Sequence, residues 1–204
     1  MARRPAHVAD RREQILEAAL KVFAAKGFRG ATNKEIAREA GITPGLIYWY
    51  FASKEDLYFA ILENRVAPET FPIPVEHLKA FPPEQVLPML AHFGLSRLDN
   101  QDSMNLLKIF VAEAAYSEKI RAMANKTFNR LLDTLSSYLA SQMDQGRLRR
   151  DDPVLCAQTF LAGLVASIMR RQFLGDPQML AYTKDQIVDT VVGIFLRGMQ
   201  PDRS

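Results

Sequence analysis

The sequence predicts an all-α protein of about nine helices in two domains. Apolar residues recur at helical spacing through most of the 204 residues, and no segment alternates in the way that a half-buried strand does. Residues that favour helix starts and helix ends punctuate this pattern. An apolar content of 48% is ample for a packed core, so a folded protein is expected rather than a disordered one.

Capping signals bound the first two helices. Asp10 and the glutamate three residues later form a capping pair, and apolar residues then recur at helical spacing until Gly27. Thr32 and Glu35 form a capping box for a second helix of barely two turns. Gly41 supplies the left-handed residue that ends this helix.

Two more short helices are expected directly afterwards. Thr43 can cap a third helix, Pro44 suits its first position, and the apolar pattern ends at about Phe51. Ser53 and Asp56 then cap a fourth helix.

A proline-rich stretch separates these four helices from the rest of the chain. Between Val66 and Pro83 the chain carries five of its eleven prolines, a density that excludes regular helix and is typical of a connection between two bodies. We therefore expect domains at residues 1–65 and 66–204. Five further helical patterns follow, at about 84–99, 102–116, 118–146, 152–174 and 183–199.

The second and third helices, joined by a tight turn, have the arrangement of a helix-turn-helix. A small core can form from apolar residues of this segment and two preceding phenylalanines: Ile36, Ala37, Ala40, Ile42, Ile47 and Phe51 against Phe23 and Phe28. The third helix then presents Gly45 and Trp49 to the outside. Tyr48 and Tyr50 lie on its flanks.

This exposed aromatic cluster favours a DNA-binding surface. Exposed aromatic side chains are costly for a monomer unless they contact a partner, and a helix of this size fits a major groove. The alternative is the core of a helix bundle, but such a core would not need the small residues of Thr43-Pro44-Gly45 at the helix tip. The formal charge also agrees, since residues 1–60 hold ten Lys and Arg against seven Asp and Glu, whereas residues 61–204 hold sixteen of each.

The segment from Arg11 to Leu62 resembles the DNA-binding domain of the TetR family. The match is carried by Ile15-Leu16-Glu17-Ala18-Ala19, Phe23, Lys26-Gly27-Phe28, Thr32, Ile36-Ala37, Ala40-Gly41-Ile42, Leu46-Ile47-Tyr48-Trp49-Tyr50-Phe51 and Ser53-Lys54-Glu55-Asp56-Leu57. The resemblance implies a homodimeric regulator whose third helix enters the major groove of double-stranded operator DNA. It places at phosphate-contacting positions Thr32, Thr43, Trp49, Tyr50 and Lys54, and at positions that can meet bases Lys34, Pro44, Gly45 and Tyr48.

The third helix lacks the side chains that usually specify bases. Between Pro44 and Phe51 there is no Arg, Asn or Gln, the residues that make bidentate base contacts. Base readout is therefore expected to depend on Lys34, on Tyr48, on apolar contact with thymine methyls and on DNA shape. The amino termini of the second and fourth helices can hold phosphates.

The last two helices are apolar on more than one face, which indicates a dimer interface. We expect a four-helix bundle with a second copy of the chain, formed by Phe160, Leu164, Ile168, Val188, Val191 and Phe195. The alternative is that these helices are wrapped within one subunit.

Apolar residues of the middle helices could line a cavity for a small, hydrophobic effector. The candidates are Met89, His92, Phe93, Met104, Phe110, Met123 and Phe128, although ordinary core positions are the alternative for most of them. We expect an effector to shift the fourth helix and release the operator.

Other functional classes have little support in the sequence. No nucleophile, metal-protease or phosphate-loop signature occurs, so we expect no enzyme, no cofactor and no metal. The single cysteine, Cys156, is expected to be a buried structural thiol. We expect no stretch close to the roughly 20 apolar residues of a membrane helix, and therefore a soluble, cytoplasmic protein. A transcriptional activator and a helical scaffold that binds another protein remain open as alternatives to a repressor.

Overall fold

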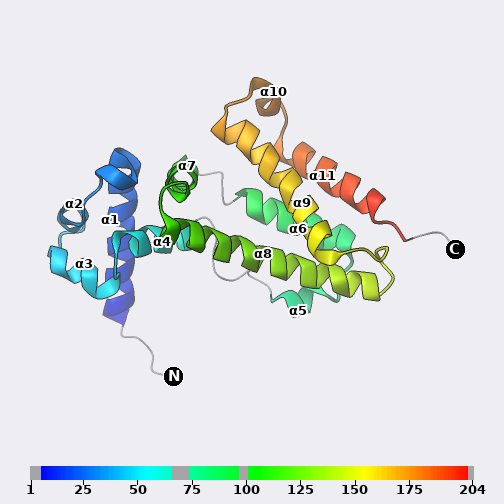
Figure 1. Cartoon of the computed structure of the whole chain (residues 1–204), viewed down its shortest axis with the longest axis horizontal. Helices are drawn as coiled ribbons and strands as arrows, with labels where there is room; N and C mark the ends of the chain where they lie inside the picture. The colour runs from blue at the N-terminus through cyan, green and yellow to red at the C-terminus, as the bar shows by residue number, and fades with distance from the viewer. Residues whose placement is uncertain (1–5, 66–73, 97–100, 202–204) are drawn as a thin grey trace. The chain divides into compact units, whose positions relative to one another are not determined.

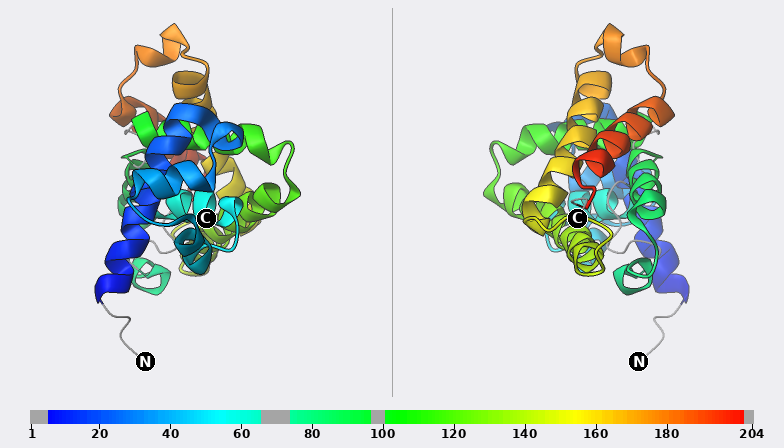
Figure 2. Two further views of the ribbon diagram at one scale, coloured as in Figure 1. Left: turned by 90° about the vertical axis from the view of Figure 1, so that its left-hand side faces the viewer. Right: turned by 90° about the vertical axis from the view of Figure 1, so that its right-hand side faces the viewer.

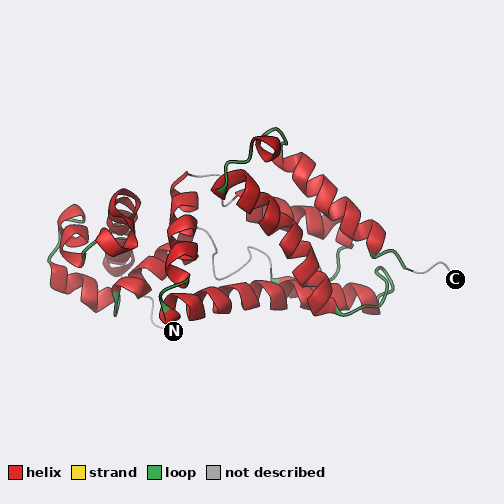
Figure 3. Cartoon of the chain, turned by 45° about the horizontal axis from the view of Figure 1, so that its top comes forward, coloured by secondary structure: helices red, strands yellow, loops and turns green. Residues whose placement is uncertain are grey.

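The computed structural model describes residues 6–65, 74–96 and 101–201, and every regular element in these ranges is a helix (Figures 1 and 3). In chain order they are α1 (Ala6–Gly30), α2 (Asn33–Glu39), α3 (Pro44–Tyr50), α4 (Lys54–Arg65), α5 (Val75–Leu78), α6 (Pro83–Ser96), α7 (Gln101–Ala114), α8 (Glu118–Asp144), α9 (Pro153–Ile168), the π-helical η1 (Met169–Phe173), α10 (Pro177–Leu180) and α11 (Lys184–Gly198). The predicted all-α class is confirmed.

Helix α1 differs from the prediction at its start and agrees at its end. It begins at Ala6, four residues before the predicted cap Asp10, because no helix-breaking residue stands between the two. Gly27, at φ 70° and ψ 173°, interrupts the helix where the sequence predicts its end. A glycine adopts this left-handed backbone without the steric cost that a side chain brings.

The helices that were predicted after α1 begin within one residue of their predicted starts. Two short helices, α5 and α10, were not predicted. The single turn α5 lies in the proline-rich stretch that was expected to contain no helix, and that expectation was wrong at Val75–Leu78. Pro74 precedes this turn, a place that proline tolerates because it needs no N–H there. The predicted helix at 152–174 changes from α to π at Met169, a change that apolar spacing alone does not reveal.

The chain forms two compact units. The first comprises residues 1–69 and 100–125, and the second comprises residues 70–99 and 126–204. Residues 100–125 thus pack with the N-terminal helices, although the sequence pattern placed them in the C-terminal domain. The functional boundary between residues 65 and 66 stays a prediction.

An aromatic cluster lies at the centre of the first unit. Tyr58 meets the rings of Phe23 and Phe28 at centroid distances of 5.0 and 5.2 Å. Around it lie further buried residues from several helices: Ile15, Leu16, Ile36, Ile47, Phe51, Leu57, Ile61, Leu106 and Ile120. Helices α1, α2 and α3, blue to cyan in Figure 1, are therefore held by one core.

The second unit is built on the packing of α11 against α6 and α9, which can be followed in the right-hand view of Figure 2. The rings of Phe160 and Phe195 meet at 5.2 Å. A side chain at Gly163 would place its Cβ 3.2 Å from Val191, so the glycine permits the close approach of α11 to α9. Cys156 is buried as predicted, and burial raises the pKa of its thiol.

One helical segment of the second unit is long and apolar enough to cross a membrane. An 18-residue window within Pro153–Phe173 reaches a mean hydropathy of 1.4, so the expectation that no stretch approaches this character was wrong here. The segment also supplies Ala157 and Phe160 to the core of the second unit.

Candidate nucleic-acid interface

Helix α3 is fixed by buried residues on one side and exposes aromatic residues on the other. Ile47 is 1% exposed and Phe51, which caps the helix end, is 5% exposed. Tyr48 and Trp49 are 59% and 69% exposed. We call the exposed surface formed by Pro44, Gly45, Tyr48 and Trp49 the reading face. Its outward orientation agrees with the helical spacing of the sequence.

The turn between α2 and α3 depends on Gly41. This residue has φ 63°, its N–H donates to the Arg38 carbonyl, and the next N–H, of Ile42, donates to the Ala37 carbonyl at 2.9 Å. These bonds satisfy carbonyls at the end of α2, as left-handed caps do. Thr43 occupies the N-cap of α3, but its side chain makes no capping hydrogen bond there, contrary to the prediction.

Gly45 has a different role from Gly41. Its φ does not lie in the left-handed region, and a Cβ built on it would meet no atom within 4 Å. The fold therefore does not require a glycine at this position. A small residue at this position leaves room for a binding partner to approach the backbone of α3 closely.

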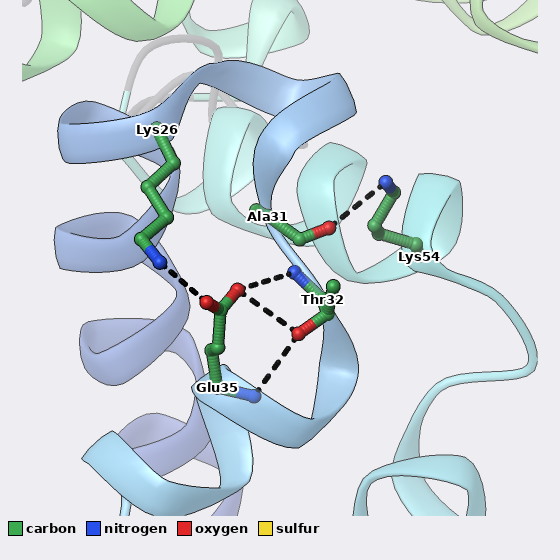
Figure 4. Close-up of polar contacts among 5 residues, drawn as sticks. All are labelled: Lys26, Ala31, Thr32, Glu35 and Lys54. Atoms are coloured by element: carbon green, nitrogen blue, oxygen red, sulfur yellow. Dashed lines mark hydrogen bonds and ion pairs between the residues drawn. The ribbon is translucent and has the colours of Figure 1, made fainter.

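The start of α2 carries the predicted capping box, and a lysine reinforces it (Figure 4). Glu35 N–H donates to Thr32 Oγ1, while the Thr32 N–H and hydroxyl donate to Glu35 Oε2. Lys26 donates to the other carboxylate oxygen of Glu35. The hydrogen bond from Lys26, followed by those from Thr32, lowers the pKa of Glu35 to about 2.

Lys54 binds the end of α1. Its Nζ donates to the carbonyls of Phe28 and Ala31 at 2.8 and 3.1 Å, and it lies 4.5 Å from the centroid of the Phe28 ring. Figure 4 shows the contact with Ala31. The ammonium thus uses two of its three donors within the chain, and a phosphate contact by Lys54 stays a prediction.

The start of α4 is capped by Ser53 and Asp56 and is also held by a lysine from α8. Asp56 N–H donates to Ser53 Oγ at 3.1 Å, and Ser53 Oγ donates to Asp56 Oδ2 at 2.7 Å. Lys119 Nζ donates to the same two oxygens at 2.7 and 2.9 Å. Partial burial acts to raise the pKa of Asp56, but the hydrogen bonds from Ser53 and Lys119 lower it overall. We call Ser53, Asp56 and Lys119 the Lys119 cluster.

All nine predicted DNA-binding residues lie in the first compact unit. Seven are exposed: Thr32, Lys34, Thr43, Pro44, Gly45, Tyr48 and Trp49. Tyr50 and Lys54 are half-buried, and the Tyr50 ring meets the Trp49 ring edge-on at 4.6 Å. The contact of each residue with DNA stays a prediction.

Two models of known protein families match this chain. Residues 15–61 match the family model of bacterial regulatory proteins of the tetR family. Residues 85–199, more than half of the chain, match the model of the C-terminal domain of AefR-like transcriptional repressors. The chain belongs to the TetR family of transcriptional regulators.

Two HTH-type transcriptional regulators that resemble this chain match different shares of its length. HTH-type transcriptional regulator SrpR of Pseudomonas putida is 45% identical over 69 residues, which are 33% of this chain and 32% of SrpR. The chain therefore spans only about a third of SrpR. AcrR of Shigella flexneri is 28% identical over 76% of this chain and 77% of its own length.

Solved structures show the same fold over nearly the whole chain. FadR of Bacillus subtilis, solved in complex with stearoyl-CoA, superposes with a TM-score of 0.72 at 19% identity and covers 92% of this chain and 99% of FadR. The TetR family consists of transcriptional regulators rather than enzymes, so the chain is a helix-turn-helix regulator.

The predicted dimer residues of this TetR-family chain need correction. Phe160, Leu164 and Val188 are buried within the subunit, at 2%, 8% and 0% exposure, so they cannot form a surface for a second copy. The other three predicted residues are half-buried: Ile168, Val191 and Phe195. Helical spacing identified apolar positions on α9 and α11 but did not distinguish the inner face from the outer one.

The predicted effector-binding residues are divided between the two units. Met104, Phe110 and Met123 belong to the first unit, and Phe110 stacks on Tyr58 there at 6.5 Å. The second unit contains Met89, His92, Phe93 and Phe128. Met104 is only 2% exposed. An effector site formed by these residues stays a prediction.

Sequence reasoning missed the residues that join α7 and α8 to α1 and to the start of α4. Arg29 contacts Glu113 with 3.0 Å between Nε and Oε1 and lies 4.7 Å from the Tyr116 ring centroid. Lys119 is separated from Ser53 by 66 positions. No local signal links partners so far apart, and each of these cations on its own is an ordinary surface residue.

Proposed function

We propose that this TetR-family regulator is a repressor that binds a specific double-stranded operator through α3 and leaves it when a small hydrophobic molecule binds. The observation that carries the proposal is the exposure of Tyr48 and Trp49 on a helix anchored by buried Ile47. Large exposed aromatics in a well-anchored helix indicate a surface that contacts a partner. A helix in the major groove is such a contact.

The reading face is suited to a mixture of base and backbone contacts. Lys34 can donate to guanine, Tyr48 can donate to or accept from a base edge, and Trp49 can pack on the sugar-phosphate backbone. Phosphate contacts fix the register on the duplex and make affinity depend on salt. Because no bidentate side chain lies on α3, operator selectivity also draws on DNA shape.

The regulator acts as a homodimer in this proposal, through the outer faces of α9 and α11. Leu155, Val165 and Ile194 are 65%, 46% and 61% exposed. The small residues Ala162 and Ala166 lie between the bulky ones at helical spacing and are exposed as well. A second copy would cover this apolar stripe in a four-helix bundle and place two reading faces about 34 Å apart. It would also cover the exposed side of Pro153–Phe173, so a soluble, cytoplasmic protein needs no membrane for this segment.

The effector is proposed to be a hydrophobic small molecule. The support is the AefR-like C-terminal domain and the fold shared with FadR, whose structure contains stearoyl-CoA. Stearoyl-CoA is therefore the first compound to try, together with smaller apolar compounds. Binding releases the operator if the effector prefers a conformation that binds DNA poorly.

A footprint on the DNA upstream of the chain's own gene tests the proposal. We expect a protected, two-fold symmetric segment at low salt that is lost when the effector is added. Protection that persists with every hydrophobic compound would contradict release by such an effector, but it would not contradict DNA binding. No protection at any salt concentration would contradict the repressor itself.

A further inference from the structure

The Lys119 cluster lies at the turn between α4 and α3, the helix that carries the reading face. Phe51 caps the end of α3 with extended backbone and is buried, and α4 begins at Lys54. Only two residues, Ala52 and Ser53, therefore separate the buried end of α3 from the start of α4. How the start of α4 is held consequently affects the direction of α3.

The segment that presents Lys119 is itself packed onto the first unit. Ile120, the next residue, is 1% exposed and belongs to the core of this unit. Leu106 of α7 is equally buried, and its carbonyl accepts a hydrogen bond from the Tyr58 hydroxyl. Arg29 and Glu113 add an ion pair between α1 and α7. The Lys119 side chain thus extends from a backbone that is packed against the core of the first unit.

A lysine at this position is unfavourable unless it has an acidic partner. Lys119 is the second residue of α8, and its ammonium lies at the amino terminus of α4. Helix dipoles disfavour a cation at both places. Asp56, in the first turn of α4, compensates this cost with a 2.9 Å contact. The contact with the capping residues is therefore the physical reason for a lysine here.

Resting on the proposed operator binding, we propose that Lys119 is a positioning residue for DNA recognition, which acts from α8 by fixing the turn between α3 and α4. The operator affinity then depends on a contact outside the helix-turn-helix. Helix α8 continues to Asp144, and its residues from Lys126 onward belong to the second unit. A change in the position of α8 therefore alters the end of α3, the helix that carries the reading face.

Operator titrations of five full-length variants test this role. Lys119→Met and Asp56→Asn should each weaken operator binding about three- to tenfold, whereas the double variant should be no weaker than the single ones, because both remove the same contact. Lys126→Met removes an exposed lysine two turns farther along α8 and should change affinity less than twofold. Lys119→Arg should recover most of the affinity. Additive single effects, or a Lys126→Met effect as large as that of Lys119→Met, would overturn the proposal.

The salt dependence separates positioning from direct contact. If Lys119 touched a phosphate, Lys119→Met would reduce the slope of log affinity against log salt by about one. The positioning role predicts an unchanged slope, so a reduced slope would overturn it.

Hydrogen exchange on the free protein keeps this inference distinct from the proposed function. Lys119→Met should speed amide exchange in residues 51–57 and leave α9 and α11 unchanged. If wild-type protein bound no DNA, the proposed function would fail even though this exchange difference appeared. Unchanged exchange together with full operator affinity in Lys119→Met would overturn only the inference.

Discussion

Replacing Gly45 with alanine should strengthen the fold and weaken DNA binding. Gly45 is the second residue of α3, its φ is not left-handed, and an added Cβ would meet no atom within 4 Å. Alanine loses less conformational freedom than glycine on folding and favours helix. The substitution should therefore be free of steric cost in the unbound chain.

The size of the expected effect differs between the free chain and its complex with DNA. A compatible glycine-to-alanine change adds about 0.4–1 kcal/mol to the free energy of unfolding. For a chain of this size the melting temperature should rise by roughly 1–4 °C. On DNA, the added methyl would displace the α3 backbone and weaken a base contact worth about 1–3 kcal/mol. The operator affinity should then fall roughly tenfold.

The assay pairs thermal unfolding with operator binding by fluorescence anisotropy, and Gly41→Ala is the control. Because Gly41 has φ 63°, alanine there should cost about 1–2 kcal/mol and lower the melting temperature. A lower melting temperature for Gly45→Ala would refute the open environment of that residue. Unchanged operator affinity would refute the close approach of the α3 backbone to DNA.

Three further predictions concern the anchor of α3, the capping box and the dimer. Ile47→Ala should lower the free energy of unfolding by about 2–5 kcal/mol in urea denaturation, because the side chain is 1% exposed; a small loss would show that Ile47 does not anchor α3. The pKa of Glu35 is lowered from 4.5 to about 2, so its carboxylate stabilises the fold fully above pH 4.5 and loses this effect as the pH falls toward 2. The difference in melting temperature between wild type and Glu35→Gln should shrink over that window, and a constant difference would contradict the lowered pKa. Val165→Glu or Ile194→Glu should sediment as a folded monomer, whereas a retained dimer would place the interface elsewhere.

The helix-turn-helix could be predicted closely because its signals are local. Thr32 and Glu35 stand three residues apart and form the capping box, and Gly41 adopts the left-handed backbone that ends α2. Helical spacing also separates buried Ile47 from exposed Trp49 correctly. In each case, neighbours in sequence are neighbours in space, and the physical preference is written in a few residues.

The residues that depend on tertiary packing could not be predicted in the same way. Phe160 and Leu155 are both apolar residues of α9, yet one is 2% exposed and the other 65%. Their spacing does not say which face meets the subunit's own core and which remains outside. The contact of Lys119 with Asp56 spans 63 positions and leaves no mark in the local sequence.

Trp49 provides the most direct test of the central claim that the reading face binds DNA. It is the only tryptophan in the chain and is 69% exposed, so its emission reports the surroundings of α3 alone. When the footprinted duplex is added at low salt, the emission of Trp49 should change until it reaches a plateau. Added salt should reverse this change. Unchanged emission together with the absence of a retarded complex at low salt would contradict the account.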